Sequence, residues 1–577
     1  MLVYGDACRT EPPRLTAARL GAQVAALDAM PPGIGRHEAL VAAFILAGEL
    51  AQGLADHAFA AAGADAPHLL PDAAMALLQG LAAAVLASWR SGFAVLPKLP
   101  GCALPEPLPA LVDLRQAEGF AFYALYPEGY AQAAAASGLG ADTQVIGLRS
   151  IGAPLAVMVA AALGAPAPVT LRPVGHPWQR RLAMTGALAD RLRQGRRFAV
   201  VDEGPGLSGS SMGAVADFLE DAGVAPGRVH FFPSHGGDPG AQASARHRGR
   251  WATAQRHVTG FDTLMRPAGG SHRPAGGSHR LVSWVADLTG PADGELQDIS
   301  GGAWRHGLPE ARWPPAATGQ ERRKFLLPAG GKRWLLKFAG LGEAGRRRAA
   351  MAAALSDAGF VPGFAGHRHG FSVERWVDGA AGTDRRPVPD AARIARYLAF
   401  RARRFPLDRG ADTAALWAMA RHNTGEHLGV AAAGALERCR FDLDDLQRRT
   451  RRIAVDGRMH AWEWLCPPSG ELLKADAVDH HDSHDLVGGQ DLAWDVAGAE
   501  IELGLDGREL GRTILDAGGP AIFPGLLAFC RPCYLAFQLG SYVMAAASCA
   551  DQAPEAKRLA AQAERYANGL RRFIGGL

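Results

Sequence analysis

Two adjacent acids stand between an apolar run and a loop of small residues. Residues 198–214 read FAVVDEGPGLSGSSMGA, and a helical pattern continues to residue 223. Backbone N–H groups at the start of a helix hold phosphate well, because they point at the ligand and carry the positive end of the helix dipole. The stretch therefore predicts a phosphate-binding loop, with Asp202 and Glu203 directly before it.

The glycines of this loop also match a dinucleotide-binding pattern. Gly204, Gly206 and Gly209 have the spacing GxGxxG. In that fold the acid that binds the ribose follows the glycines by about 20 residues, at the end of the next strand. Here the acids come first, and residues 220–224 read EDAGV and belong to a predicted helix. Nicotinamide binding is therefore a weak alternative.

A strand that ends in two acids and enters a small-residue loop resembles the type I phosphoribosyltransferases, which bind phosphoribosyl pyrophosphate (PRPP). The resemblance makes Asp202 and Glu203 catalytic residues that accept hydrogen bonds from the two ribose hydroxyls. The residues that it places around the 5′-phosphate are Ser208, Gly209, Ser210 and Ser211. The GPGL spacer is one residue longer than is usual in the family. An ordinary strand–turn–helix, with glycine for geometry alone, is the alternative.

Two upstream segments extend this resemblance. The segment VIGLRSIGAPLAVMVAAALG (145–164) is similar to the family's pyrophosphate-binding loop, so Arg149, Ser150 and Gly152 would meet the diphosphate. TLRPVGHPWQRR (170–181) is similar to its flexible flap. The flap cations that could neutralise the leaving group are Arg172, His176, Arg180 and Arg181. A solvated surface loop is the alternative for this segment.

The resemblance implies displacement of pyrophosphate at the anomeric carbon, with Mg²⁺ on the diphosphate and no protein nucleophile. A segment further along, FFPSHGGDPGAQASARHRGRW, would supply the acceptor side. Its candidate residues are Ser234, His235 and Trp251. The acceptor itself cannot be identified from these residues.

The C-terminal part resembles a second family, the aminoglycoside phosphotransferases and kinase-like proteins. KRWLLKFAGLG places Lys337 on a strand, as in the ATP-contacting strand, and FSVERWVDG (371–379) resembles the hinge. Asp476 ends a strand, as the family's metal ligand does. Asp491 and Asp495 match its structural pair of aspartates.

The catalytic loop of that family is matched less well. DGRMHAWEWL offers Asp456 as the catalytic acid and Glu463 as a metal ligand, with no Asn between them. No Glu lies where a helix should pair with Lys337, because Arg346 to Arg348 occupy that region. HHDSHD (480–485) leaves three interpretations open: a zinc site, a role beside a kinase-type Mg²⁺ site, or a solvated polar turn.

The elements that must position these residues change in kind along the chain. Residues 1–112 are rich in Ala and Leu at helical spacing and end in a proline-rich linker. From 113 to 290 short β-branched runs alternate with helices, which predicts a parallel sheet. Residues 291–577 begin with a hairpin pattern and continue in long helices. The expected fold class is α/β and multidomain: a helical N-terminal region, a phosphoribosyltransferase-like domain and an α+β kinase-like domain.

Composition limits the partners. The 577-residue chain has 48% hydrophobic and 20% charged residues and a net charge of only +4, so no nucleic acid is expected as a partner. Seven scattered cysteines fit reduced thiols. No apolar run is expected to reach the ~18 residues of a membrane span. The protein is therefore expected to be cytoplasmic, with a small-molecule substrate and a homodimer as one option for assembly.

Two functions remain open. In the first, a PRPP-binding enzyme acts on a base or small molecule and the kinase-like domain transfers phosphate; the resemblances imply Mg²⁺, PRPP as substrate and, for an active kinase-like domain, ATP. In the second, the chain senses PRPP or a nucleotide without turnover, and a degenerate kinase-like domain regulates. The identical tandem copies RPAGGSH (266–272 and 273–279) predict a surface loop and add nothing to either function.

Overall fold

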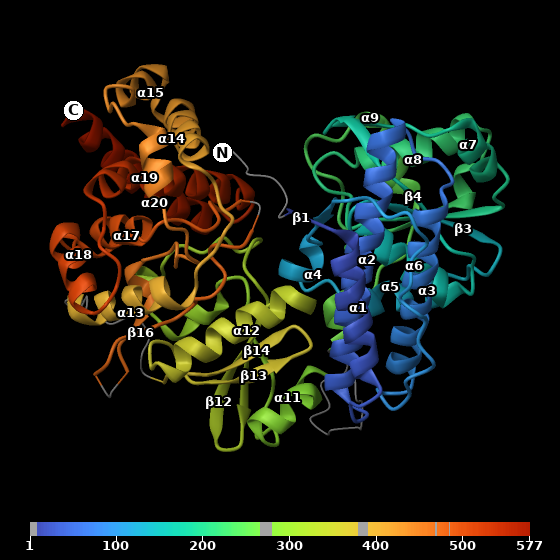
Figure 1. The fold of residues 1–577 in the computed structure, drawn as a ribbon, viewed down its shortest axis with the longest axis horizontal. Helices are drawn as coiled ribbons and strands as arrows, with labels where there is room; N and C mark the ends of the chain where they lie inside the picture. Colours follow the sequence, from blue (N-terminus) through green and yellow to red (C-terminus); the bar gives the residue numbers. More distant parts are fainter. Residues whose placement is uncertain (1–7, 266–279, 379–389, 468–469, 484, 577) are drawn as a thin grey trace.

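The computed structural model describes residues 8–265, 280–378, 390–467, 470–483 and 485–576. The tandem RPAGGSH copies and the last residue of the predicted hinge lie outside them. Figure 1 shows two parts side by side: N-terminal helices and a parallel sheet in blue to green, and an antiparallel sheet with a helical lobe in yellow to red.

Three helices form the N-terminal region. They are α1 (Pro13–Leu27), α2 (Ile34–Ala62) and α3 (Leu69–Arg90). The abundance of Ala and Leu at helical spacing accounts for their length, and Gly63 ends α2 in the left-handed conformation at φ 70°. The proline-rich residues 95–111 form neither helix nor strand in the structure.

The expectation about membrane-spanning length is wrong for two of these helices. α2 and α3 are long and apolar enough to cross a membrane, judged by length and composition alone. Much of their apolar stretches is buried inside the protein, 78% in α2 and 56% in α3, and core helices meet the same criterion. The two helices pack on each other and on the helix α6 (Gly152–Leu163). They therefore serve as one layer over the parallel sheet.

The parallel sheet has the strand order β4-β3-β7-β8-β9. Its strands are β3 (Thr143–Leu148), β4 (Val169–Leu171), β7 (Arg197–Val201), β8 (Val229–Phe232) and β9 (Gln255–Arg256). The chain leaves β3 for β4 on one side and returns to β7 on the other. The direction of winding therefore changes between β3 and β7, and in open α/β sheets ligands bind outside the carboxyl ends of such strands.

Alternating residues of these strands face two separate layers. Val145, Ala199 and Val201 belong to the core formed with α2, α3 and α6, whereas Ile146 and Val200 pack with the helices of the opposite face. The remaining helices around this sheet are α4 (Glu118–Phe122), α5 (Pro127–Ala136), α7 (Gly186–Arg193), α8 (Ser210–Asp221), α9 (Ala245–Thr253), α10 (Phe261–Met265) and α11 (Leu281–Thr289). The two strand pairs beside it are β1 (Cys8–Glu11) with β2 (Val112–Arg115) and β5 (Pro173–His176) with β6 (Gln179–Leu182).

The second sheet is antiparallel throughout, in the order β10-β11-β12-β14-β13. Its strands are β10 (Gln297–Asp298), β11 (Lys324–Ala329), β12 (Lys332–Phe338), β13 (Phe364–Arg368) and β14 (Phe371–Arg375). The helix α12 (Gly342–Asp357) connects β12 to β13. Gly330 and Gly331 turn the β11–β12 hairpin at positive φ, as the central GG of the sequence predicts.

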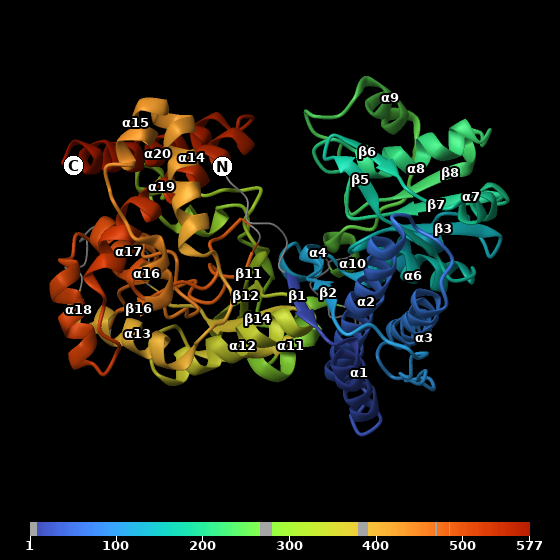
Figure 2. The same ribbon diagram turned by 45° about the horizontal axis from the view of Figure 1, so that its top comes forward.

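A helical lobe completes the chain. Its helices are α13 (Ala391–Arg404), α14 (Thr413–Leu428), α15 (Val430–Leu436), α16 (Leu443–Arg449), α17 (Ala493–Leu503), α18 (Gly507–Asp516), α19 (Pro524–Ser548) and α20 (Ala553–Gly575). A short pair of strands, β15 (Trp464–Leu465) and β16 (Leu473–Lys474), lies between α16 and α17 in the chain. The turned view in Figure 2 shows this lobe on the side of the antiparallel sheet away from the parallel one.

One hydrophobic core joins the two parts. It contains residues of α2 and α3, of one face of the parallel sheet, and of the antiparallel sheet, such as Phe325, Phe338 and Phe371. A second core lies within the helical lobe. The N-terminal region, the parallel sheet and the antiparallel sheet thus share buried apolar surface, which couples their stabilities.

Candidate functional site

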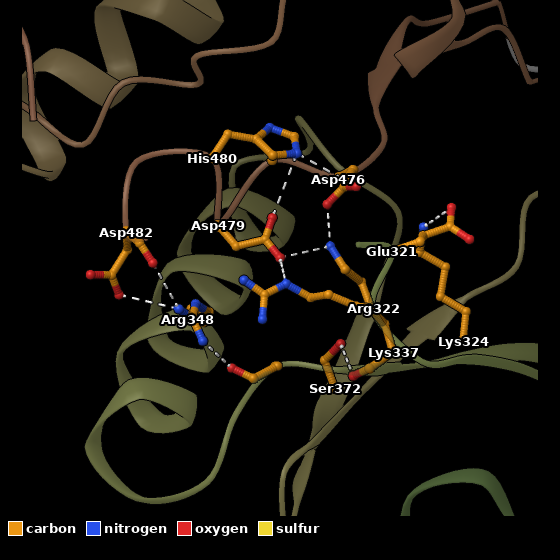
Figure 3. A network of polar contacts seen from close by, with 12 residues as sticks. Glu321, Arg322, Lys324, Lys337, Arg348, Ser372, Asp476, Asp479, His480 and Asp482 are labelled. Atoms are coloured by element: carbon orange, nitrogen blue, oxygen red, sulfur yellow. Dashed lines mark hydrogen bonds and ion pairs between the residues drawn. The ribbon is translucent and has the colours of Figure 1, made fainter. Parts of the chain in front are cut away.

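A group of charged side chains lies between the antiparallel sheet and the helical lobe. Lys337 of β12 points toward Asp476, which follows β16, and forms an ion pair with it (Figure 3). Its Nζ also lies 3.1 Å from Oδ2 of Asp479. The lysine is 7% exposed and Asp476 is 25% exposed, so the group meets solvent at Asp476.

Two further cations face the same carboxylates. Arg322, just before β11, donates to Asp479 with Nε 2.6 Å from Oδ2. His480 has Nε2 3.6 Å from Asp476 Oδ2 and 3.7 Å from Asp479 Oδ1 (Figure 3). One ligand atom each from Asp476, Asp479 and His480 lie within 4.8 Å of one another, which is close enough for one cation.

These charges determine the protonation of the group. Burial by itself would raise the pKa of Asp476, but Lys337 and His480 hold that pKa well below its usual value. Burial would lower the pKa of Lys337, but Asp476 and Asp479 raise it. The site therefore contains ionised carboxylates at neutral pH, which oxygen-binding cations such as Mg²⁺ require.

Asp456, expected to be a catalytic acid, lies in the interior. It is 1% exposed, accepts a hydrogen bond from the hydroxyl of Tyr397, and has Oδ1 3.3 Å from Nζ of Lys474. Both oxygens of Asp495 hold its loop by accepting from the backbone N–H groups of Asp456 and Gly457. The carboxylate is enclosed and already paired in this conformation, so its catalytic role stays a prediction.

Glu463, expected to be a metal ligand with Asp476, is placed differently as well. It is 8% exposed and accepts from Nζ of Lys474 at 2.7 Å. It belongs with Asp456 and His480 to one group that could hold a metal ion, whereas Asp476 belongs with Asp479 and His480 to another. The carboxylate partner of Asp476 is thus Asp479, a residue that sequence reasoning did not select.

The helix α12 follows the strand of Lys337, and it carries Arg348 where the kinase-like resemblance expects a Glu that pairs with the lysine. Arg348 of α12 is 3% exposed, donates to the carbonyl oxygens of Ala121 and Ala339, and lies 3.3 Å from Oδ2 of Asp482. Asp482 also pairs with Arg347 and Arg409. Two residues of the HHDSHD segment therefore have different partners. His480 faces Asp476 and Asp479, and Asp482 pairs with the arginines of α12.

A second group lies at the carboxyl ends of β3 and β7, where the sheet changes its winding direction. Asp202 directly follows β7, and its Oδ1 accepts from the N–H of Glu203 at 2.9 Å. Tyr130 donates to the carbonyl of Asp202. Burial raises the pKa of Asp202 to about 7, because the hydrogen bond from the N–H of Glu203 and the charge of Arg172 offset little of that cost. Both acids remain partly exposed.

Arg149 is not available to a diphosphate, contrary to the sequence expectation. Its side chain is 2% exposed, and it donates to Asp56 of α2 at 2.8 Å and to Asp65. Arg172 binds the same Asp56 and donates to the carbonyl of Arg149 at 2.8 Å, with Nη2 3.4 Å from Oγ of Ser150. These guanidinium groups fasten the N-terminal helices to the loop after β3.

The predicted flap is the β5–β6 hairpin, and it covers the small-residue loop. The hydroxyls of Ser208 and Ser210 both donate to the carbonyl oxygen of Pro177 at the hairpin tip, at 3.2 and 2.8 Å. Gly209 caps α8 at φ 62°, and Ser211 is partly exposed. In this arrangement the carbonyl oxygen of Pro177 accepts hydrogen bonds from two hydroxyls that were expected to bind a phosphate.

Gly152 has a steric role at this edge. A Cβ on it would lie 2.7 Å from the carbonyl oxygen of Val201 and 3.5 Å from Oδ1 of Asp202. The absence of a side chain lets the N-terminus of α6 approach the end of β7. Of the acceptor-side candidates, Trp251 is buried and donates to the carbonyl of Gly237, whereas His235 is exposed.

Several partners were missed by sequence reasoning. Asp479 stands one residue before the HHDSHD segment, and its proximity to Asp476 was the only available signal. Arg322, Asp56 and Asp65 carry no motif, and Arg322 lies more than a hundred residues from its partner in the chain. Only the fold brings them to their sites.

Comparisons with known proteins give a fold-level result. No family model matches the chain, and no curated protein matches it. About half of the chain is similar to solved kinase and phosphotransferase structures. The choline kinase LicA from Streptococcus pneumoniae is 17% identical over 43% of this chain and 89% of that one, with a TM-score of 0.31.

Two other structures give similar values. A macrolide 2′-phosphotransferase type I is 14% identical over 50% of this chain and 95% of that one, with a TM-score of 0.33. An aminoglycoside phosphotransferase from Alicyclobacillus acidocaldarius is 15% identical over 44% and 91%, with a TM-score of 0.25. Scores this low assign no role to any residue, so the roles proposed below come from contacts within this chain.

Proposed function

We propose that the C-terminal half transfers a phosphoryl group from a nucleoside triphosphate to a small molecule. The observation that carries the proposal is the contact of Lys337 with Asp476 and Asp479 at the boundary between the sheet and the helical lobe. A lysine beside two ionised carboxylates can bind phosphate oxygens while the carboxylates bind the accompanying cation.

The donor set fits Mg²⁺. Asp476 and Asp479 supply the oxygen ligands that this ion prefers, and Asp476 is the member that meets solvent. A bound ion would neutralise charge that develops on the transferred phosphoryl group. Lys337 and Arg322 now pair with the two carboxylates, so an incoming ion would release both cations toward the phosphates.

The buried acids would have a positioning role in this proposal. Asp495 fixes the loop that carries Asp456, and Lys474 joins Asp456 to Glu463. His480 lies between this buried pair and Asp476, with Nδ1 4.0 Å from Asp456 Oδ1. The buried acids and His480 together hold Asp476 and Asp479 in position.

Calorimetric titration of the full chain with ATP, in the presence and absence of Mg²⁺, tests the proposal. We expect Mg²⁺-dependent binding that Lys337→Met weakens at least about tenfold, because one charge-assisted phosphate contact contributes roughly 1.5–3 kcal/mol. Lys332→Met is the matched control, since Lys332 is exposed at the far end of the same strand. Equal binding by both variants, or no binding by the wild type, would reject the site.

A second candidate function belongs to the parallel sheet. Asp202 and Glu203 at the β3/β7 crossover support binding of a phosphorylated sugar, with PRPP as the specific candidate. The site requires the β5–β6 hairpin to move from Ser208 and Ser210, because their hydroxyls now donate to Pro177. Hairpin opening is a common way to admit a ligand and then exclude water.

Titration with PRPP followed by a pyrophosphate-release assay over a panel of nucleobases separates the two forms of this candidate. Release supports a transferase, and binding without release supports a sensor. Asp202→Asn combined with Glu203→Gln should abolish binding, whereas Asp190→Asn on the exposed face of α7 should not. Failure of the wild type to bind PRPP or ribose 5-phosphate would remove this candidate and leave the phosphotransferase proposal intact.

A further inference from the structure

A fully buried group of two histidines and a glutamate lies where three separate segments meet. His37 comes from α2, Glu128 from α5 and His369 from the turn between β13 and β14. None of the three side chains is exposed to solvent. The group is therefore part of the junction between the N-terminal helices, the parallel-sheet part and the antiparallel sheet.

The potential ligand atoms converge. Nε2 of His37 lies 2.8 Å from Oε1 of Glu128, and Nε2 of His369 lies 3.4 Å from the same oxygen. One ligand atom from each residue fits within 4.8 Å. Zinc–nitrogen and zinc–oxygen bonds of about 2.0–2.2 Å separate neighbouring ligand atoms in a tetrahedral site by roughly 3.3–3.6 Å, so the His37–Glu128 contact would have to open by about half an ångström to admit the ion.

Several polar atoms of the group lack hydrogen bonds. Oε2 of Glu128 and both ring nitrogens of His369 have no hydrogen-bond partner among the described residues. Buried polar groups without partners are costly, and each such group in a native protein calls for an explanation such as an ion. A metal would take Oε2 of Glu128 and Nε2 of His369 as ligands and remove the cost at these two atoms.

Neighbouring residues hold the two histidines in place, as hydrogen-bond partners of metal ligands commonly do. Nδ1 of His37 lies 3.0 Å from Oγ of Ser88, which directs Nε2 toward Glu128. His369 has a positive φ of 42°, and its backbone is fixed by the carboxylate of Glu38 and the hydroxyl of Tyr126. Aromatic rings, among them Phe93 and Trp284, pack against the two histidines.

We propose that His37, Glu128 and His369 bind a structural zinc ion that joins the antiparallel sheet to α2 and α5. Two imidazoles and one carboxylate are a ligand set that zinc accepts, and alkaline-earth cations prefer oxygen alone. The ion would replace a hydrogen-bonded contact by coordination across segments more than two hundred residues apart in the chain. This site is independent of the proposed phosphotransferase centre.

The test measures metal in the untagged full-length protein. After incubation with zinc and dialysis against Mg²⁺ buffer, we expect roughly one zinc ion per chain, with two imidazole ligands in the zinc-edge X-ray absorption spectrum. The number of imidazoles separates this group from the two carboxylate groups near Lys337, in which His480 is the one histidine among the described residues. Zinc retention below a tenth of that amount, or a single imidazole, would overturn the proposal.

Variants sharpen the assignment. His369→Asn should reduce retained zinc at least fivefold, whereas His367→Gln on the neighbouring strand should keep it, because His367 pairs with Glu38 outside the group. His480→Asn should keep it as well. If His369→Asn fails to fold, the wild-type stoichiometry and absorption spectrum still decide. Full zinc retention by a folded His369→Asn protein would contradict the proposed ligand set.

Discussion

Asp202 and Asp476 are both carboxylates that follow a strand, yet their surroundings push their protonation in opposite directions. Asp476 has Lys337 in contact and His480 nearby, and its pKa lies well below the usual value despite burial. Asp202 has only the hydrogen bond from the N–H of Glu203 and the charge of Arg172 to oppose burial, and its pKa rises to about 7. Arg149, which the sequence also assigned to the second site, is instead held by Asp56 and Asp65.

The comparison shows that the charge state and availability of a carboxylate depend on which cations the fold places beside it. At the antiparallel sheet the acids are charged and paired, so a cationic ligand must displace Lys337 and Arg322 from them. At the parallel sheet the positive side chains are bound by acids of α2 and of the loop after it, so Asp202 is available but costly to ionise. The four predictions that follow test this contrast.

The largest effect is expected from Lys337→Met. It removes the cation shared by Asp479, which is buried, and Asp476, which is one quarter exposed, and this costs about 3–5 kcal/mol in the free energy of unfolding at pH 7. Because Asp476 and Asp479 have lowered pKa values in the fold, the wild type gains stability from them above their unfolded-state pKa and loses it as the pH falls. The difference between variant and wild type in urea unfolding should therefore shrink at acidic pH.

Lys332→Met serves as the control for this measurement and should change stability by less than about 0.5 kcal/mol, since Lys332 is exposed. A difference between Lys337→Met and wild type that stays constant from pH 7 down to about pH 2 would contradict the electrostatic explanation, because both carboxylates lose their charge below their unfolded-state pKa of about 4.

Arg149→Met should be next in size. The arginine is the shared partner of Asp56 and Asp65, and its loss leaves Asp65 with the backbone N–H of Arg172. We expect a loss of about 3 kcal/mol, measured by urea unfolding, because breaking a buried pair strands a charge. Arg193→Gln is the comparison variant, because its pair with Asp190 is exposed and should contribute almost nothing. Similar losses in the free energy of unfolding of the two variants would show that the contacts of Arg149 with Asp56 and Asp65 do not stabilise the fold.

Gly152→Ala should have an intermediate effect. The added Cβ would lie 2.7 Å from the carbonyl oxygen of Val201, so α6 must move away from β7 at a cost of about 1–3 kcal/mol. The movement would also widen the edge that carries Asp202. Gly186→Ala is the control, since a Cβ there meets nothing within 4 Å and should be neutral or slightly stabilising. An unchanged melting temperature for Gly152→Ala would reject the close approach.

The smallest effect, and one of opposite sign, is expected from Asp202→Asn. Folded Asp202 keeps its proton up to about pH 7, whereas an unfolded Asp loses it near pH 4, so wild-type stability falls as the pH rises between these values. Asn stays neutral and can still accept from the N–H of Glu203. The variant should be more stable than wild type at pH 8 by about 1–2 kcal/mol and equal to it at pH 4, because partial exposure screens the effect.

Thermal unfolding across this pH range measures the effect, with Asp190→Asn on the exposed face of α7 as control. A variant that is less stable than wild type at pH 8 would mean that Asp202 is ionised and paired, which would erase the contrast with Asp476.

Much of the local structure followed from periodicity. The alternation of short β-branched runs and helices gave β3, α6, β7 and α8 at their observed places, and the glycines of the β11–β12 turn were recognised by type. The strand-end position of Asp202 was also predictable, because apolar residues stop there. The assignment of the middle part to the phosphoribosyltransferases stays a prediction.

Three motif-based assignments share one feature in the structure. Arg149, Asp456 and Glu463 were interpreted by their motif, yet each is enclosed by partners distant in the sequence or on another element. Asp479 was overlooked because it lacked a motif, although it contacts Lys337 as Asp476 does. A motif identifies a residue type and a turn, but it does not show what will pack against them.

The sequence by itself determined the secondary structure and the ends of the strands, since hydrophobic period and glycine positions act over a few residues. Only the tertiary structure decided the charge state and availability of each acid. Lys337 is 139 residues from Asp476, and Arg172 is 116 residues from Asp56. Electrostatic energy depends on distance in space and on burial, and neither quantity exists until the sheets and helices have packed.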